Sequence, residues 1–425
     1  MKHKLFIFAL LAGLPLTLLA QSTLADCQRM ARDNYPLIKR YGILEQTKQY
    51  TLSNIAKGWL PQISASAQAT YQNAVMELPD GLKSMIEQMG SEVQGLKKDQ
   101  YKIALDVSQQ LYDGGAISAQ KKLAQAQNEM EIAQNDVDLY ALRDRVNSVF
   151  FSLLLVEDRL SVNRETQTLL QANEDKLNAM LKGGVVTESD RDAVRAERLS
   201  ALQQQTQLKA QQTSLLQVLS LYCGQDIQAI VKPSATPAVS QEPGRPELKL
   251  FGHQLDLIDQ QEKVLNSGLL PKISLFAQGY YGYPGYNMFG DMFSHKWSLN
   301  GTIGARITWN IGALYTRHND KAKLENQRQD IANARETFLF NNQLQSAQEN
   351  SLIESYQTLL SEDDEIIALR TSVRRAAEAK LNHGIVDVTS LLEEITRENQ
   401  ARINRSTHEV EMLQHIYNLK NITNE

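Results

Sequence analysis

The chain has 425 residues, of which 42% are hydrophobic and 22% are charged, and its formal net charge is −5. A nucleic-acid-binding protein of this size is usually basic, so the composition does not indicate a polyanionic partner. The apolar content is too high for a wholly disordered chain, and two cysteines exclude a disulfide-rich scaffold or a four-thiolate zinc site.

The first 20 residues are predicted to be an export signal. A short basic start precedes an almost entirely apolar run from Leu5 to Leu19, and Ala20 is a small residue suited to cleavage. The run is shorter than the roughly 20 residues that a membrane-spanning helix needs. A lipoprotein signal ending at Cys27 is the alternative, although Asp26 suits the position before a lipidated cysteine poorly.

Four segments alternate apolar and polar residues with the two-residue period of a β-strand. They cover residues 63–71, 101–111, 273–283 and 297–311. Each is about 10 to 15 residues long, which is enough for a tilted membrane-spanning strand. The polar positions include charged and amide residues, so this face is expected to meet water rather than a packed core.

All three tryptophans lie at the ends of these segments. They are Trp59, Trp297 and Trp309. Aromatic residues at strand ends are typical of a membrane interface. The alternative is a soluble β-sandwich with the aromatic residues in its core, but the polar faces of the strands disfavour it.

Long runs without glycine or proline predict helices. The runs are 116–182, 185–223, 313–383 and 385–425, and glycine turns at 183–184 and 384 separate the members of each pair. Glycine is the favoured residue directly after a helix. The pattern predicts two helical hairpins, whose longest helices could reach on the order of 100 Å.

Apolar residues recur every seven positions in the first and third runs, as in a coiled-coil seam. An acidic stretch at 362–365 interrupts neither pattern and is interpreted as a solvated helix face. The first seam consists of Ile132, Leu139, Val146, Leu153 and Leu160, and the second of Leu324, Ile331, Phe338, Leu352, Leu359, Ile366 and Val373.

Short patterns recur in the two halves of the chain. Leu60-Pro61-Gln62-Ile63-Ser64 matches Leu270-Pro271-Lys272-Ile273-Ser274, and Gly184-Val185-Val186 corresponds to Gly384-Ile385-Val386. Two tandem repeats are therefore predicted, each reading helix, strand, strand, long helix, helix. The expected boundaries are a signal peptide at 1–20, a first repeat at 21–231 with strands within 62–112 and a hairpin at 116–223, a linker at 232–246, and a second repeat at 247–425 with strands within 272–311 and a hairpin at 313–420.

Four antiparallel strands cannot close a barrel, and lipid does not tolerate an open sheet edge. Outer-membrane barrels have at least eight strands, so two copies would supply eight strands and three copies twelve. Such an oligomer would gather its hairpins into a hollow bundle, which describes a conduit rather than a pocket. The sequence contains no phosphate-binding loop, no Gly-x-Ser-x-Gly and no His-Glu-x-x-His motif, so no enzyme activity, cofactor or metal is expected.

Several motifs follow one another in a distinctive order. Ser22-Thr23-Leu24-Ala25-Asp26 and Asn34-Tyr35-Pro36 are followed by the duplicated Leu-Pro-x-Ile-Ser, Tyr-Asp-Gly-Gly and Gly-(Val/Ile)-Val turns. In this order and spacing the mature chain resembles the TolC family of outer-membrane efflux proteins. The resemblance implies a mainly α-helical homotrimer with one shared twelve-stranded β-barrel in outer-membrane lipid and a helical tunnel in the periplasm. It also implies docking onto a periplasmic adaptor protein and an inner-membrane pump.

The family also places a gate at the second glycine turn, where acidic rings narrow the periplasmic entrance. Its pattern is roughly Val-Asp-Val-x-Asp, and here the sequence reads Val386-Asp387-Val388-Thr389-Ser390. The resemblance implies a gate role for Asp387, whereas Ser390 stands where a second acid is common. Asp190 occupies the equivalent position in the first half and could contribute instead. Both acids would equally suit a helix N-terminus, where the helix dipole favours them.

The tips of the hairpins and the strand charges are the remaining candidate sites. Exposed valines at the turns, Gly183-Gly184-Val185-Val186 and Gly384-Ile385-Val386, are expected to contact the adaptor. Packing between neighbouring hairpins is the alternative. Lys102, Asp106 and Arg306 are expected to face the barrel lumen and bias ion selectivity, or else to pair across strands.

Cys27 opens the first helix and Cys223 ends the fourth. In the TolC family both ends lie near the equatorial region, so a disulfide is conceivable in an oxidising periplasm. The alternative is that both cysteines are small buried apolar residues.

The function expected from the residues and the resemblance is that of a passive outer-membrane exit duct for small molecules. The exit duct of a type I protein-secretion system is an alternative within transport. A surface coiled-coil tether is the alternative from a different class, but a tether does not need amphipathic strand pairs.

Overall fold

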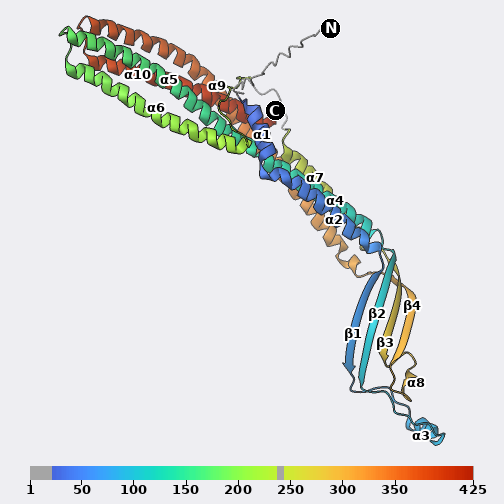
Figure 1. Ribbon diagram of the computed structural model, residues 1–425. Coiled ribbons are helices and arrows are strands. Elements are labelled where there is room, and N and C mark those ends of the chain that lie inside the picture. Colours follow the sequence, from blue (N-terminus) through green and yellow to red (C-terminus); the bar gives the residue numbers. More distant parts are fainter. Residues whose placement is uncertain (1–21, 237–243, 425) are drawn as a thin grey trace, which may run out of the picture. The chain divides into compact units, whose positions relative to one another are not determined.

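The computed structural model of the protein describes residues 22–236 and 244–424. The expected signal peptide and part of the expected linker therefore lie outside the described residues. The chain forms two compact units (Figure 1). One takes its described residues from 1–40, 135–248 and 335–425, and the other from 41–134 and 249–334, so each unit combines both halves of the sequence.

The first unit is helical and contains two hairpins. α5 (Leu142–Lys182) and α6 (Glu188–Cys223) form the first hairpin. α10 (Val388–Thr423) forms the second with the C-terminal part of α9 (Ala313–Asn382). α10 also packs beside α5, so the two hairpins share an interface.

The first predicted heptad seam forms the core of this unit. Val146 and Leu153 of α5 are completely buried and pack with Leu219 of α6. α1 (Leu24–Asn34), which a short 3-10 helix at Pro36–Lys39 follows, packs against α5 and α6. Burial of these apolar side chains stabilises the hairpin by about 25 cal/mol per Å² of apolar surface removed from water.

The second predicted seam is only partly buried on α9. Its apolar members from Leu324 to Leu359 are half-buried, but Ile366 and Val373 are each 46% exposed, whereas Asp363 and Arg374 are buried. These two polar residues pair with His408 and Glu398 of α10, so toward its C-terminal end α9 meets α10 through ion pairs rather than through the apolar stripe.

The predicted helical run 116–182 is divided into α4 (Ala116–Tyr140) and α5. Ala141, which separates them, keeps helical dihedrals (φ −60°, ψ −17°) and still donates its N–H to the carbonyl oxygen of Val137 at 3.1 Å. The backbone therefore stays helical through the interruption.

The second unit contains an antiparallel sheet in the order β1-β2-β3-β4, as the alternating segments predicted. The strands are β1 (Gln62–Tyr71), β2 (Asp99–Tyr112), β3 (Lys272–Tyr283) and β4 (Ser298–Thr308). β2 and β3 are neighbours although they come from different halves of the sequence. β1 and β4 are the outer strands, and each has one edge that no other described strand pairs with.

Helices complete the second unit, and an ion-pair cluster joins two of them. Glu262 of α7 lies 2.8 Å from Nζ of Lys321 and 2.7 Å from the guanidinium of Arg328 on α9. These hydrogen bonds lower the pKa of Glu262 to about 2. The further elements of this unit are α2 (Arg40–Ala56), the 3-10 helix Lys57–Trp59, α3 (Asp80–Gln88), α7 (Pro246–Ser267) and α8 (Met288–Asp291).

None of the helices in the described part of the chain combines the length and the apolar character needed to cross a membrane.

Candidate functional site

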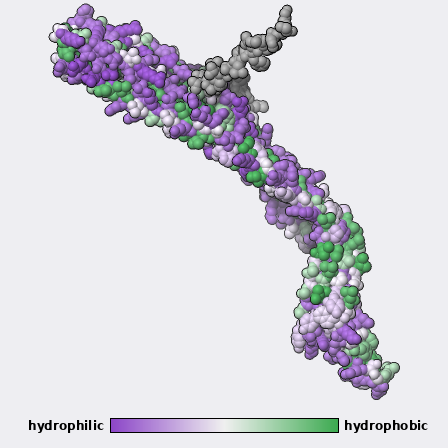
Figure 2. Space-filling model, in the orientation of Figure 1, coloured by the Kyte–Doolittle hydropathy of each residue, from purple (hydrophilic) through white to green (hydrophobic). Residues whose placement is uncertain are grey.

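One face of the sheet is apolar across all four strands. Ile63 lies opposite Val107, and Ala277 opposite Ile303, and residues opposite each other in an antiparallel pair share a face. Ile303 is 83% exposed. Figure 2 shows hydrophobic residues gathered over the strands. The large exposed side chains of this apolar face are Ile63, Tyr71, Tyr101, Ile103, Leu105, Leu275, Tyr281, Leu299, Ile303 and Ile307.

The opposite face is polar and holds the three charged residues expected in a lumen. Nζ of Lys102 donates to Oε1 of Gln278 at 3.2 Å, and the amide of Gln278 donates to Asp106. The guanidinium carbon of Arg306 lies 4.9 Å from the ring centroid of Phe276. Each charge therefore shares this face with the others and also has a cross-strand neighbour, as the alternative of cross-strand pairing expected.

Aromatic side chains mark both ends of the sheet. Trp59 lies three residues before β1 begins and Trp309 directly follows β4, whereas Trp297 directly precedes β4 at the other end. Trp297 stacks on Tyr101 with 6.0 Å between ring centroids and contacts Tyr281 at 5.3 Å. Because all three tryptophans stay partly exposed, their rings are available to an interface between apolar and aqueous surroundings.

The two glycine turns of the helical unit have the same backbone geometry. Gly184 and Gly384 adopt left-handed conformations, with φ of 72° and 67°. In each turn the N–H of the next residue, Val185 or Ile385, donates at 3.0 Å to the carbonyl oxygen five residues earlier. This hydrogen bond is typical of a helix end closed by glycine, because a Cβ atom is disfavoured at positive φ.

The acids expected at the gate are helix caps. The hydroxyl of Thr187 accepts the N–H of Asp190 at 3.2 Å, and the Asp190 carboxylate accepts the N–H of Thr187 at 2.9 Å. After the second turn, Oδ1 of Asp387 accepts the N–H of Ser390 at 2.9 Å and its hydroxyl at 2.6 Å. The first repeat has the hydroxyl at the cap position, Thr187, and the acid three residues later, Asp190. The second repeat has the acid at the cap position, Asp387, and the hydroxyl three residues later, Ser390.

Hydrogen bonding also sets the charge state of the second cap. The side-chain hydroxyl of Ser390, followed by its backbone N–H, lowers the pKa of Asp387 below its ordinary value. Asp387 is an exposed residue, and with this lowered pKa its carboxylate is ionised at neutral pH.

The apolar residues of the turns divide into two pairs. Val185 and Ile385 are 62% and 69% exposed. Val186 and Val386 instead pack against an apolar cluster of both hairpins that includes Leu391. The expectation of exposed valines therefore holds only in part for Val186 and Val386, which are half-buried. Val185 and Ile385 present most of the outward apolar surface of the turns.

Between α9 and α10 the structure places a polar seam that sequence analysis did not find. Glu398 is its centre, with Nε of Arg374 at 2.5 Å, the Arg402 guanidinium at 2.8 Å and the Thr371 hydroxyl at 3.0 Å. Burial alone raises the pKa of Glu398, but hydrogen bonds from Arg402, Arg374 and Thr371 outweigh it and leave the pKa below its ordinary value. Glu398 is therefore a buried, ionised carboxylate.

Two histidine–carboxylate pairs extend the seam. Nδ1 of His408 lies 2.6 Å from Asp363, and Nδ1 of His415 lies 2.6 Å from Glu349. The ring of Tyr356 stacks on His415 with 5.4 Å between centroids. The acidic stretch 362–365 was interpreted as a solvated face, which is wrong for Asp363. Glu349, Tyr356 and Asp363 recur every seven residues, and this spacing could have predicted the polar seam. The seam was missed because a search for apolar residues at that spacing does not include them.

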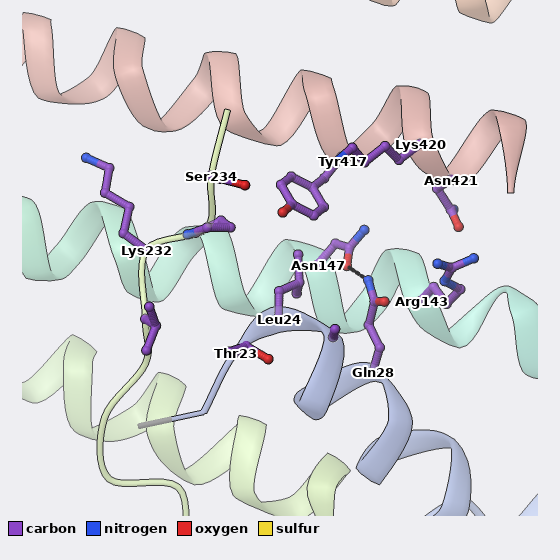
Figure 3. A pocket seen from close by; sticks show the side chains of 13 residues that line it. Thr23, Leu24, Gln28, Arg143, Asn147, Lys232, Ser234, Tyr417, Lys420 and Asn421 are labelled. Carbon is purple, nitrogen blue, oxygen red and sulfur yellow. Dashed lines mark hydrogen bonds between the residues drawn. The ribbon is translucent and has the colours of Figure 1, made fainter. Parts of the chain in front are cut away.

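A cavity of about 430 Å³ lies in the helical unit between α1, α5, α10 and residues 231–234 (Figure 3). Figure 3 shows Gln28 and Asn147 pointing toward each other, joined by a hydrogen bond of 2.6 Å. Lys232 is paired with Asp158 and Glu409, so its charge is already compensated. The cavity combines basic and amide side chains but has no arrangement of nucleophile and base.

Residues 30–225 match the family model described as Outer membrane efflux protein. These residues include β1, β2 and the whole first hairpin with its glycine turn. Over this segment the chain is similar to outer membrane efflux proteins, in agreement with the resemblance to the TolC family. A search of curated proteins finds no match to this chain.

Solved structures of outer-membrane channels share the fold over nearly the whole chain. The channel OprN has a TM-score of 0.66 at 16% identity, covering 94% of this chain and 89% of OprN. CmeC of Campylobacter jejuni has a TM-score of 0.62 at 14% identity, covering 94% and 85%. VceC of Vibrio cholerae has a TM-score of 0.64 at 12% identity, covering 94% of each chain. At these identities the likeness confirms the fold that the sequence predicted.

Proposed function

We propose that the protein is the passive exit duct of a tripartite export system, in which a periplasmic adaptor and an inner-membrane pump deliver small molecules to it. The observation that carries this proposal is the two-faced sheet of β1 to β4. Its apolar face is suited to lipid, and its polar face holds Lys102, Asp106 and Arg306 in contact with water. A sheet of this kind separates lipid from an aqueous path.

The edges of the sheet argue for a homotrimer. β1 and β4 each offer unpaired backbone groups along one edge, and such groups are too costly to leave in lipid. Pairing β4 of one copy with β1 of the next removes every edge, and three copies close a barrel of twelve strands. The exposed apolar residues Leu369 and Val373 of α9 also favour a neighbouring copy, because they have no cover within the chain.

The gate is proposed at the hairpin tips. Threefold repetition would bring three Asp387 carboxylates, and three of Asp190, around one axis. Like charges at a narrow constriction repel each other and attract cations, so a cation bound in this ring would offset the repulsion and stabilise the closed state.

The adaptor contact is proposed at Val185 and Ile385. These are the outward apolar side chains of the two turns, and the polar residues around them leave no cover for them within the chain. Exposed apolar side chains at the end of a rigid hairpin are typical of a protein–protein contact. Cargo choice is assigned to the pump, since a duct needs no specific pocket along its path.

A planar-bilayer measurement on detergent-purified protein tests the proposed function. A trimer by mass that gives small, cation-sensitive currents is the expected result. A monomer or dimer without current would contradict the duct, and the hairpins would then have to serve as a scaffold. Because mass and current come from the same chromatographic peak, misfolded material is separated from a folded protein that does not conduct.

A further inference from the structure

Cys27 and Cys223 meet in the apolar core of the helical unit. Cys27 lies on α1, and Cys223 is the last residue of α6. Their exposures are 0% and 5%, and the cluster around them includes Leu24, Ala31 and Leu219. Both residues are free thiols in the structure. The proposed gate and tip contacts use neither of them.

The two thiols lie side by side. Sγ of Cys223 is 3.7 Å from the backbone oxygen of Cys27, toward which it donates a hydrogen bond. The hydrogen bond between the two thiols, and then burial, raise the pKa of Cys27. A disulfide requires that the Cβ atoms of the two cysteines come close to each other, and this side-chain contact between two packed helices brings the two residues together.

Contacts at both ends of α1 hold the thiols in this position. Nδ2 of Asn34 donates to the carbonyl oxygens of Leu221 and Tyr222 at 3.1 Å each, at the end of α6. Gly224 follows with φ of 70°, and a Cβ atom there would lie 2.5 Å from Asn34. α1 can therefore approach α6 this closely only because residue 224 is glycine.

The other end of α1 is fixed by the backbone. The N–H of Ser22 donates to the carbonyl oxygen of Ala229, and the N–H of Val231 donates to that of Ser22, both at 3.1 Å. Residues on either side of Cys27 are thus bonded to residues on either side of Cys223. The alignment of the two cysteines is determined by the surrounding fold and not by the thiols themselves.

We propose that Cys27 and Cys223 form a structural disulfide in the exported protein. The inference rests on the outer-membrane location, since a chain that reaches this membrane passes through the oxidising periplasm. The oxidant is a periplasmic protein disulfide. A thiolate of one cysteine attacks a sulfur of that disulfide, which forms a mixed disulfide and releases one oxidant thiolate. The second cysteine thiolate then attacks the mixed disulfide, forms the Cys27–Cys223 bond and releases the other oxidant thiolate.

In this exchange the two thiols lose two protons and two electrons, and the oxidant disulfide gains them and becomes a dithiol. Because both side chains are buried in the folded chain, the reaction takes place before α1 has packed onto α6. The bond then joins the start of the mature chain to the end of the first hairpin and restricts the unfolded state.

Thiol counting by intact mass tests the disulfide. Protein from isolated outer membranes is denatured with N-ethylmaleimide present and without reductant. No maleimide adduct is expected, with two adducts after reduction and a 27–223 cross-linked peptide in the digest. Two adducts without reductant would overturn the proposal, and so would a lipid-sized mass increase at Cys27. The count is made on denatured protein, so it stays valid whether or not the channel conducts.

Matched variants distinguish the effect of the disulfide bond from the effect of packing two cysteine side chains in the core. Cys27→Ala and Cys223→Ala should each give one adduct without reductant, because the remaining thiol loses its partner. Reductant should lower the melting temperature of the wild type by several degrees and leave the Cys27→Ala/Cys223→Ala protein unchanged. An equal effect of reductant on both proteins would count against the disulfide. If a variant does not accumulate in cells, the adduct count on the wild-type protein still tests for the disulfide.

Discussion

At the scale of single residues, Asp387 combines two roles that can be separated. Its carboxylate caps α10 through Ser390, and the same carboxylate would supply charge to the proposed gate. Asparagine caps a helix about as well as aspartate but carries no charge, whereas alanine does neither. The two substitutions therefore distinguish the cap from the charge.

We predict that Asp387→Asn raises closed-state conductance several-fold and removes most of its cation sensitivity. The melting temperature should change little, because the cap is kept. Asp387→Ala should raise conductance as well and in addition cost about 1 kcal/mol of stability from the lost cap. Single-channel recording together with thermal unfolding measures both quantities. Unchanged conductance in both variants would remove Asp387 from the gate.

Glu398 is the residue that makes the polar seam sensitive to acid. Its pKa is below the ordinary 4.5 in the folded chain, so the unfolded state binds a proton more readily. The stabilisation from this group is fully present above about pH 4.5 and is lost as pH falls through the folded pKa. Acid should therefore loosen α9 from α10.

We predict that Glu398→Gln weakens the dependence of the melting temperature on pH between pH 6 and pH 3. At neutral pH the variant should be less stable by about 3 kcal/mol, because the Arg374 guanidinium loses its buried partner. Glu393→Gln, at an exposed position on the same helix, is the control and should leave the profile unchanged. A wild-type slope in Glu398→Gln would show that other groups cause the acid sensitivity.

At the scale of elements, a strand places consecutive side chains on opposite faces of the sheet, so neighbouring residues can have different surroundings. Thr302 and Ile303 are adjacent on β4 but point to opposite faces of the sheet. Ile303 lies on the apolar face, and Thr302 shares the other face with Gln278. The two positions therefore lie on the same strand and differ mainly in the face of the sheet on which their side chains lie.

We predict that Ile303→Lys blocks stable assembly in the outer membrane whereas Thr302→Lys does not. A lysine facing lipid near the middle of the membrane costs about 2 to 4 kcal/mol, and each trimer would carry three of them. A lysine in the lumen stays hydrated and should change only conductance and ion preference. Membrane fractionation with heat-modifiable gel mobility measures assembly. Equal assembly of the two variants would mean that the apolar face does not meet lipid.

At the scale of the whole molecule, the outward apolar residues of the two glycine turns are proposed to bind the periplasmic adaptor. Val185 and Ile385 follow equivalent glycine turns, so one adaptor surface repeated around the trimer could contact both. Replacing them should leave the channel itself intact, because they are exposed and are absent from the apolar cluster below the tip.

We predict that Val185→Glu/Ile385→Glu abolishes cross-linking to the periplasmic adaptor and sensitises cells to exported compounds, with trimer yield unchanged. Leu199→Glu, an equally drastic change at an exposed position on α6, is the control for surface charge. Co-purification after cross-linking, with trimer content from the same sample, provides the readout. Normal adaptor recovery by the tip variant would exclude this contact.

The sequence by itself determined the local structure of this protein. Period-two alternation located all four strands, and the absence of glycine and proline located the long helices. Glycine and cap residues located both turns, because backbone conformation at positive φ and helix ends depends on neighbours in the chain. The polar face with Lys102, Asp106 and Arg306 also followed, since alternation alone assigns residues to a face.

Only the tertiary structure decided which faces meet. Toward its C-terminal end the contact face of α9 depends on Glu398 and His408, which are supplied by a different helix, so the apolar heptad did not locate it there. Val186 and Val386 are half-buried because the two hairpins pack against each other. The approach of Cys27 to Cys223 likewise depends on Asn34 and Gly224 fitting together. Contacts between residues distant in the chain carry no local pattern, and for that reason they could not be predicted from it.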